Sequence, residues 1–345
     1  MQAVQIHAHG GPEVLQVVDI PRPEPGPGEV LCKVLAVSVN HLDIWVRRGM
    51  PGFDVPFPRI LGCDGTAEIV AVGRGVKTTG VGQKVLLEPG YNQSLESAEV
   101  RRGEDYLAAD YGLRGEHCDG FDAEYVVLHE RYVTPLPAGL DPVTTAATPL
   151  VFLTAWGMLM ERARVRAGET VLVLAAGSGV GSAAIQIAKA EGATVIATAG
   201  CDRKLQLGLD LGADHVVDHC PDDWSKEVKR LTGGRGVDLV VEHVGPATWS
   251  ESMRCMARNA RLVTCGGTTG PKVNLILPHL FIKNLSILGS TMGPRSAFPL
   301  ILERLAAGIY RPVLNSTMPM SEVAQAHRVL EDRGVVGKVV LIPGQ

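Results

Sequence analysis

The sequence predicts an α/β protein in which a β-rich domain accompanies a domain built on a doubly wound parallel sheet. Two observations along the 345 residues carry this prediction. Residues 1–135 contain short β-type runs broken by Pro and Gly, a texture typical of a β-rich domain. From about residue 149, short apolar strands alternate with helical segments, which indicates a parallel sheet.

In the first part, strands are expected where β-branched and apolar residues gather, at 3–11, 29–39, 65–73 and 123–128. Pro and Gly in 21–29 predict a turn-rich connector. The polar stretch 88–120 is longer than an ordinary connection, which predicts a functional segment or a small lobe.

In the second part, strands and helices are expected in alternation. The strands are 170–177, 193–200, 215–218, 237–245, 261–267 and 285–293, and the helices are 179–192, 202–212, 222–234 and 249–260. Two further helices, 297–308 and 321–334, and a last strand, 337–344, follow.

Composition excludes several classes of function. The net charge of −4 gives no support for binding nucleic acid or an anionic membrane. No apolar run approaches the ~20 residues of a transmembrane helix, and no signal peptide is expected. The seven cysteines are scattered without a CxxC pair, which predicts a cytoplasmic protein with reduced thiols. Hydrolase and NTPase motifs are missing from the sequence.

The strongest chemical signal is the glycine turn between the strand 170–177 and the helix 179–192. Its residues allow a pyrophosphate to approach the helix N-terminus, which predicts a Rossmann-type dinucleotide site. The strict G-x-G-x-x-G pattern is not met, so a turn that only packs helix on strand is the alternative. The predicted contacts are Gly177, Ser178, Gly179, Val180 and Gly181.

The end of the next strand favours NADPH over NADH. Gly200 and Cys201 are small and leave room for a phosphate, and Arg203 and Lys204 follow at a helix start. Asp202 lies near the distance expected of an NAD carboxylate, but we interpret it as the N-cap of that helix. A solvated helix face is the alternative for the basic pair.

The motifs together resemble the medium-chain dehydrogenase/reductase superfamily. Those that carry the resemblance are "GPEVLQVVDIPRPEPGPGEVL", "VNHLDIWVRRG", "PRILGCDGTAEIVAVG", "GLRGEHCDGFDAEYV", "TPLVFLTAWGML", "AAGSGVGSAAIQIAKAEGATVIATAG" and "GVVGKVVL", which cover nearly the whole chain in family order. The resemblance implies a GroES-like catalytic domain of residues 1–153 and 291–345 and a Rossmann dinucleotide-binding domain of residues 154–290.

Within that superfamily the sequence is similar to the zinc-free quinone oxidoreductase branch. The positions that match the catalytic zinc ligands of alcohol dehydrogenases are Asn40, Cys63 and Phe152, so no metal is expected. The cysteines of the structural zinc lobe are also missing from 88–120, which implies a metal-free remnant; a partly disordered loop is the alternative. An unusual metal site would have to use His41, Cys63, Asp64 and Glu116.

The resemblance implies an NADPH-dependent reductase that transfers hydride to a quinone or an α,β-unsaturated carbonyl. Two alternatives stay open: a zinc-dependent alcohol dehydrogenase with substituted ligands, and a non-catalytic NADPH-binding protein. A homodimer or homotetramer is expected, since the apolar strand 285–290 would form a sheet edge that needs cover.

Individual positions carry over from the resemblance. Asn40 and Asp43 are the expected catalytic residues, with capping as their alternative role. Trp45, Phe152 and Phe281 are expected to wall the substrate pocket, although large aromatics are more often plain core. The further cofactor contacts expected are His41, Thr154, Val244, Cys265, Gly266, Gly267 and Lys338.

Overall fold

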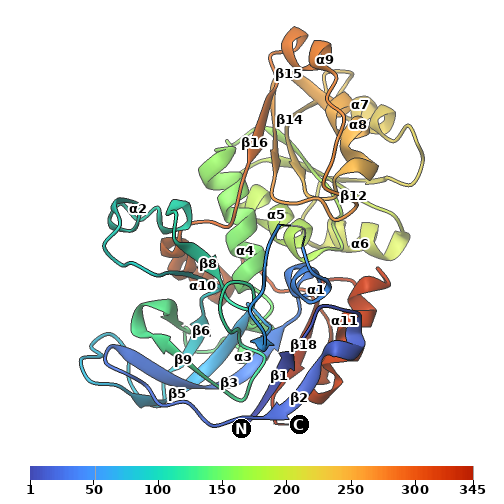
Figure 1. The fold of residues 1–345 in the computed structure, drawn as a ribbon. Coiled ribbons are helices and arrows are strands. Elements are labelled where there is room, and N and C mark those ends of the chain that lie inside the picture. Colours follow the sequence, from blue (N-terminus) through green and yellow to red (C-terminus); the bar gives the residue numbers. More distant parts are fainter. Residues whose placement is uncertain (51, 345) are drawn as a thin grey trace. The chain divides into compact units, whose positions relative to one another are not determined.

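The structure, a computed structural model, describes residues 1–50 and 52–344 (Figure 1). The chain forms two compact units. Unit 1 comprises Met1–Leu150 with Pro294–Gln345, and unit 2 comprises Val151–Gly293. No helix in the described ranges is long and apolar enough to cross a membrane.

Unit 1 is built on a seven-stranded sheet that contains the C-terminal strand. The order is β10 (Val133–Pro135), β6 (Lys84–Leu87), β5 (Gly65–Val72), β3 (Glu29–Ser38), β18 (Lys338–Ile342) and β17 (Leu314–Pro319), with β9 (Tyr125–His129) also paired to β3. Val340 pairs with Ser38 in antiparallel register. The start of β18 therefore lies beside the end of β3, although some 300 residues separate them in the chain.

Smaller elements complete unit 1. A second sheet has the order β2 (Gln16–Asp19), β1 (Gln2–Ile6) and β4 (Arg59–Ile60), and the helices include α1 (His41–Arg48), α3 (Pro142–Thr145), α10 (Phe298–Ala306) and α11 (Val323–Glu331). One apolar core joins β1, β3, β5 and α11. Its buried members include Val4, Val34, Ile69, Phe121 and Ala326.

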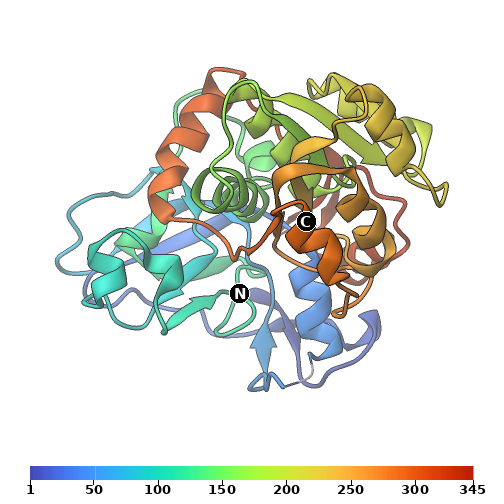
Figure 2. The same ribbon diagram turned by 90° about the horizontal axis from the view of Figure 1, so that it is seen from above.

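The segment 88–120 is a folded lobe. Its short strands β7 (Gly90–Asn92) and β8 (Tyr111–Leu113) pair with each other, and α2 (Ala98–Arg101) and a 3-10 turn at Asp105–Leu107 lie between them. The buried Glu88 anchors its base by accepting two hydrogen bonds from Arg295, each 2.9 Å long. These contacts fold the segment, drawn in teal in Figures 1 and 2, which favours the lobe over the disordered loop.

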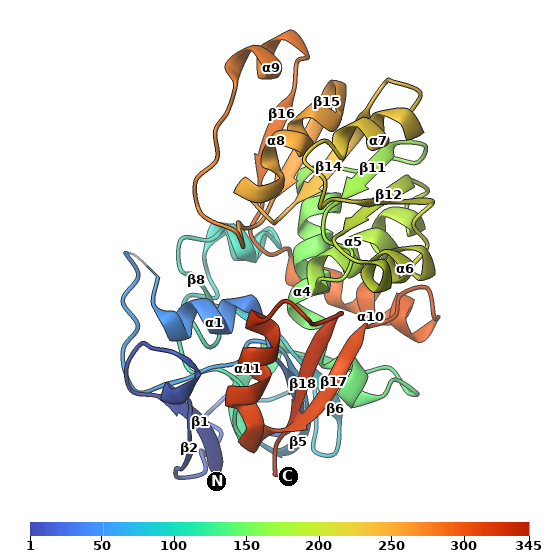
Figure 3. The ribbon, with the colours of Figure 1, turned by 90° about the vertical axis from the view of Figure 1, so that its right-hand side faces the viewer.

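Unit 2 contains the predicted parallel sheet. Its order is β13 (His215–Asp218), β12 (Thr194–Ala199), β11 (Thr170–Val173), β14 (Val237–Glu242), β15 (Met256–Thr264) and β16 (Ser286–Gly289), and all neighbours are parallel. The helices α5 (Gly179–Ala190), α6 (Asp202–Asp210), α7 (Ser225–Leu231), α8 (Pro246–Cys255) and α9 (Leu277–Ile282) connect the strands (Figure 3). This is the doubly wound α/β architecture with a GroES-like companion that the sequence predicts.

Two local predictions are wrong. The helix expected over 249–260 ends at Cys255, and β15 begins at Met256 because this segment pairs with β14. Tertiary pairing there overrides helix propensity. The N-cap of α6 is Cys201, and Asp202 is the first helical residue.

Candidate functional site

The residues predicted to bind a dinucleotide lie at one edge of the unit 2 sheet. They follow the carboxyl ends of β11, β12, β14 and β15, which are neighbours in that sheet. The order reverses between β11 and β14, and ligands of open α/β sheets bind beside such a switch point. The residues brought to this edge are Gly177, Ser178, Gly179, Val180, Gly181, Gly200, Cys201, Arg203, Lys204, Val244, Cys265, Gly266 and Gly267.

The glycine turn requires glycine at its last position. A Cβ on Gly181 would lie 2.2 Å from the carbonyl oxygen of Ala175, which is backbone and cannot move aside. Ser178 caps α5, since its hydroxyl accepts a hydrogen bond of 2.9 Å from Gly181 N–H. The turn therefore presents the N-terminus of a twelve-residue helix, a position that favours an anion.

Lys204 lies against the glycine turn. A Cβ on Gly177 would come within 2.7 Å of Cγ and Cδ of Lys204, so the lysine stem packs over this glycine. Arg203 and Asp202 are exposed beside it. Because Asp202 does not cap the helix, its carboxylate stands at the strand end beside the basic pair, where an NAD ribose would be recognised.

The sequence interpretation missed one basic and one acidic residue near the glycine turn. His243 is buried, and its Nε2 lies 3.0 Å from Leu174 O and 3.5 Å from Ser178 Oγ. Burial lowers the pKa of His243, so the ring is neutral at physiological pH. Glu242 is buried and accepts hydrogen bonds from the N–H groups of Val244 and Gly245, at 2.7 and 3.0 Å. The polar "EH" pair at the end of a buried strand was the available signal.

Other predicted cofactor contacts have structural roles inside unit 2. Thr154, on α4 (Pro149–Trp156), is buried and donates to Met292 Sδ at 3.5 Å. A Cβ on Gly267 would lie 2.4 Å from Gly270 O, so the loop after β15 needs glycine there. Val244 O accepts a backbone hydrogen bond from Thr269, 2.8 Å long. These contacts fold the loops that follow β14 and β15.

In unit 1, Asn40 is the centre of a buried polar network. Its amide nitrogen donates to Ser38 O at 3.1 Å and to Asp64 Oδ2 at 2.9 Å, and lies 3.5 Å from Cys63 Sγ. Both amide hydrogens are thus engaged within the protein. This geometry is that of a positioning residue, and the expected catalytic role of Asn40 stays a prediction.

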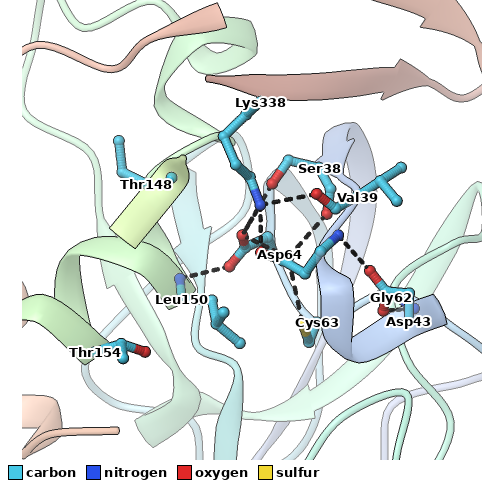
Figure 4. Close-up of polar contacts among 12 residues, drawn as sticks. Ser38, Val39, Asp43, Gly62, Cys63, Asp64, Thr148, Leu150, Thr154 and Lys338 are labelled. Atoms are coloured by element: carbon cyan, nitrogen blue, oxygen red, sulfur yellow. Dashed lines mark hydrogen bonds and ion pairs between the residues drawn. The ribbon is translucent and has the colours of Figure 1, made fainter. Parts of the chain in front are cut away.

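Lys338 supplies the positive charge of this network (Figure 4). Its ammonium donates to Val39 O at 2.9 Å and to the carbonyl oxygen of Asn40, and lies 3.3 Å from Asp64 Oδ2. A lysine has three donor hydrogens, and these contacts use all of them. The buried ammonium of Lys338 is part of this network, and its expected contact with the cofactor stays a prediction.

Asp64 and Asp43 link the network to the backbone by accepting hydrogen bonds from N–H groups. Asp64 accepts hydrogen bonds from Ser38 Oγ at 2.9 Å and from Leu150 N–H at 2.5 Å (Figure 4). Asp43 accepts from the N–H groups of Asn40 and Gly62, at 2.7 and 3.2 Å. Asn40 and Asp43 therefore form the start of α1, and the capping alternative describes their local contacts.

Buried acids in this region are hard to ionise. Burial raises the pKa of Asp43 to about 7, against the opposing effect of its hydrogen bonds and of Lys338. Burial, together with the charge of Asp43, also raises the pKa of Asp122 well above the ordinary value. A Cβ on Gly62 would lie 2.3 Å from Asp122 Oδ1, so both carboxyl groups flank the same glycine.

The proposed pocket aromatics have different environments. Trp45 is half-buried on α1, and its ring lies 6.3 Å from that of His41, the first residue of this helix. In unit 2, Phe152 is buried and Phe281 is 65% exposed. Phe281 is therefore part of an apolar surface and does not wall a pocket within its own unit.

The unit 1 network does not fit a zinc ion. Across residues 1–50 and 52–344, no three His, Cys, Asp or Glu side chains gather in a way that could hold a metal. Cys63 would have to bind zinc as a thiolate, and burial raises the pKa of this thiol well above its usual value. Lys338 already pairs with Asp64, and the Glu116 carboxylate lies 3.5 Å from His117 Nδ1. The alternative ligand set of His41, Cys63, Asp64 and Glu116 thus gains no support.

Comparison with known proteins finds family models for both units and relatives that match nearly the whole chain. A model described as alcohol dehydrogenase GroES-like domain matches residues 26–138, and one described as zinc-binding dehydrogenase matches residues 179–307. A quinone oxidoreductase of Pseudomonas aeruginosa is 32% identical over 352 residues, with 99% of both chains covered.

Solved structures give two further likenesses. A structure described as an NAD-dependent alcohol dehydrogenase has a TM-score of 0.96 and 46% identity, and the match covers 100% of both chains. A crotonyl-CoA carboxylase/reductase in complex with NADP has a TM-score of 0.90 and 25% identity, with 99% of this chain and 94% of the other covered.

Proposed function

Because the chain belongs to the quinone oxidoreductase-like branch of the medium-chain dehydrogenase/reductase superfamily, we propose that it is a metal-independent NADPH-dependent reductase of quinones or α,β-unsaturated carbonyls. That it is an NAD(P)-dependent oxidoreductase follows from its relatives. The nucleotide preference, the acceptor and the independence from metal are the proposal.

The observation that carries the proposal is the network in unit 1. Where metal-dependent relatives would need ligands, Asn40, Cys63 and Asp64 hydrogen-bond to each other and to Lys338. An asparagine amide and a carboxylate already paired with Lys338 are poor zinc ligands, so this network does not offer the metal site that a Lewis-acid mechanism of alcohol oxidation requires. Conjugated acceptors can be reduced without a Lewis acid. Their electrophilic carbon is already activated, and hydrogen-bond donors or water can stabilise the developing negative charge.

The chain's own residues would hold the cofactor and shape the site. Bound NADPH supplies the hydride. The N-terminus of α5, with Gly179 and Val180, would receive the pyrophosphate, and Lys204 with Arg203 would favour a 2′-phosphate. Asn40 and Asp43 would position the start of α1, and Lys338 would keep this region electrically balanced.

Two observations favour alternatives. One relative, 46% identical, is described as NAD-dependent, and Asp202 is available at the strand end, so NADH is the competing cofactor. Other relatives are alcohol dehydrogenases that bind metal, for example the cobalt and zinc bound enzyme from Pyrobaculum aerophilum. A zinc-dependent alcohol dehydrogenase with substituted ligands is therefore the second candidate.

The test measures metal content and turnover in one preparation. The purified protein is dialysed against a strong chelator, and NADPH oxidation is followed with a quinone, an enone and an aldehyde. We expect turnover with the quinone or the enone and the same rate before and after dialysis. Zinc at one per chain, with alcohol oxidation that is lost on dialysis and restored by zinc, would establish the second candidate. Tight NADPH binding without turnover of any acceptor would leave a non-catalytic binding protein.

A further inference from the structure

His243 is a buried histidine directly after β14, and the proposed hydride transfer does not use it. Its Nε2 lies 3.0 Å from Leu174 O and 3.5 Å from Ser178 Oγ, both in the glycine turn. Burial lowers the pKa of His243, against the opposing charge of Glu242, so the ring is neutral. A carbonyl oxygen can only accept, so Nε2 carries the hydrogen of the neutral ring. His243 therefore donates a hydrogen bond to the first residue after β11.

This hydrogen bond lies beside a strained point of the turn. Ala175, the next residue, has a φ of 54°, in the left-handed region that residues with a Cβ rarely adopt. Hydrogen bonds fix the backbone on both sides of it. Leu174 O accepts from His243, Ala175 N–H donates to Thr198 Oγ at 3.4 Å, and Ala176 N–H donates to Thr198 O at 2.8 Å. Strained residues persist only where the surrounding contacts determine them, so these bonds maintain the turn.

The carbonyl that His243 binds lies against the start of α5. A Cβ on Gly181 would lie 2.9 Å from Leu174 O and 2.2 Å from Ala175 O, so both carbonyl groups pack against this glycine. Gly181 N–H donates to Ser178 Oγ, the atom that also lies near His243 Nε2. A change in the backbone at Leu174 and Ala175 would therefore displace the N–H groups that are available to an anion.

The backbone of His243 contacts a second loop of the predicted dinucleotide site. Its carbonyl oxygen accepts hydrogen bonds from Thr268 Oγ at 3.2 Å and from Thr268 N–H at 3.4 Å. Thr268 lies in the loop after β15, directly after the predicted cofactor contacts Gly266 and Gly267. The ring and the carbonyl group of one residue thus join two segments of the site that are far apart in the chain.

We propose that His243 is a positioning residue that keeps the glycine turn in the shape that receives the pyrophosphate of the nucleotide. Its hydrogen bond to Leu174 O stabilises the strained backbone at Ala175, so the turn has this shape before a nucleotide binds. Nucleotide affinity then depends on the fraction of molecules with that turn, because only they bind. The effect on affinity rests on the proposed function, whereas the effect on the turn does not.

Nucleotide titration of four variants tests the effect on affinity. His243→Leu removes the donor, and the Kd values of NADPH and NADH should both rise by about 10-fold, since both nucleotides carry the pyrophosphate. His243→Gln supplies an amide N–H near the position of Nε2 and should restore most of the affinity. Ala175→Gly in the His243→Leu background should also recover affinity, because glycine adopts a positive φ without strain. Val228→Ala, in the buried core beside α7, is the control that should lower Tm and leave both Kd values unchanged.

Three results of the titration would overturn the positioning role. They are equal losses of affinity in His243→Leu and His243→Gln, a loss for NADPH alone, and no recovery on adding Ala175→Gly. His243→Asn, whose shorter amide does not reach Leu174 O, replaces the leucine variant if the latter does not fold.

Hydrogen exchange of the nucleotide-free protein tests the effect on the turn. The amides of residues 175–181 should exchange about 10-fold faster in His243→Leu than in the wild type, and His243→Gln should restore slow exchange. Equal exchange in the wild type and in His243→Leu would overturn the positioning role. Faster exchange in His243→Leu, together with a wild-type protein that binds no nucleotide, would support the effect on the turn and contradict only the proposed function.

Discussion

At the scale of single residues, buried charges in unit 1 are held by partners from distant parts of the chain. Lys338 pairs with Asp64, and Arg47, which is fully buried, contacts His327 and Glu331. A buried charge without a partner costs several kcal/mol, on the order of 3–5, so such pairs are sensitive to the loss of either member. Two predictions follow at this scale, one for binding and one for stability.

Lys204→Glu should weaken NADPH binding far more than NADH binding. The lysine stem packs on Gly177 in the turn, and its ammonium is the proposed partner of the 2′-phosphate, which NADH lacks. Loss of a hydrogen bond to a charged group costs about 1.5–3 kcal/mol, so the NADPH Kd should rise by at least ~10-fold. The measurement is nucleotide fluorescence titration. Lys226→Glu, on the exposed face of α7, is the matched control. Equal losses of affinity for the two nucleotides would show that Lys204 does not contact the 2′-phosphate.

His327 should make unit 1 acid-sensitive. Arg47 donates to His327 Nδ1 at 3.1 Å, so this nitrogen must be unprotonated. Burial and then the charge of Arg47 lower the pKa of His327 to about 3. The unfolded chain therefore binds more protons below about pH 6.5, and stability is lost as the pH falls toward 3.

His327→Gln keeps an acceptor for Arg47 and removes this titration. Between pH 7 and pH 5, the wild-type protein should lose about 2 kcal/mol more unfolding free energy than the variant. Urea denaturation at the two pH values measures the difference. If both proteins lose the same amount, His327 titrates normally in the folded state.

At the scale of elements, the glycine turn after β11 depends on two glycines for different reasons. At Gly181 an added methyl group would meet backbone, whereas at Gly177 it would meet the flexible stem of Lys204. The lobe 88–120 is a second case, since its strands β7 and β8 pair only with each other and Glu88 ties its base to Arg295. In both elements, a few contacts fix the shape of a long irregular segment.

Gly181→Ala and Gly177→Ala form a matched pair that tests this difference. Gly181→Ala should destabilise unit 2 by about 1–3 kcal/mol, since a backbone oxygen 2.2 Å away cannot yield. Gly177→Ala should cost less than about 1 kcal/mol but should displace Lys204 and so weaken NADPH more than NADH. Thermal unfolding and nucleotide titration of each variant are the measurements. Equal Tm losses would show that the lysine stem is as immovable as backbone.

At the scale of the whole molecule, unit 2 exposes an apolar surface at its sheet edge. β16 is the last strand of the sheet, and the segment before it carries several exposed apolar side chains. They are Val273, Leu275, Ile276, Leu277, Phe281 and Ile282. An unpaired edge beside such a patch is usually covered in soluble proteins, so we propose that it joins two copies of the chain.

A double substitution in this apolar surface should dissociate the assembly into monomers. The protein should sediment as a dimer or tetramer at micromolar concentration, and Ile276→Glu with Phe281→Glu should shift it toward monomers. Glutamates replace apolar area that would otherwise be buried, at ~25 cal/mol per Å². The paired control is Val81→Glu, an exposed apolar residue of unit 1. A wild-type monomer, or an assembly unaffected by the double substitution, would contradict the proposed interface.

The sequence by itself determined the two-part architecture, the alternating elements of unit 2 and the glycine turn. These features arise from local patterns, namely the spacing of apolar residues and the few residue types that permit a tight turn. It could not determine the start of β15, because "MARNA" has no strong strand preference and pairing with β14 decided it.

Only the tertiary structure decided the unit 1 network. Lys338 meets Asn40 because β18 pairs with β3. The local contacts of Asn40 and Lys338 have the same origin, since their donors meet partners that no local pattern predicts. Hydrogen bonds and ion pairs act over a few ångströms in space, and distance along the chain does not predict which side chains will share that space.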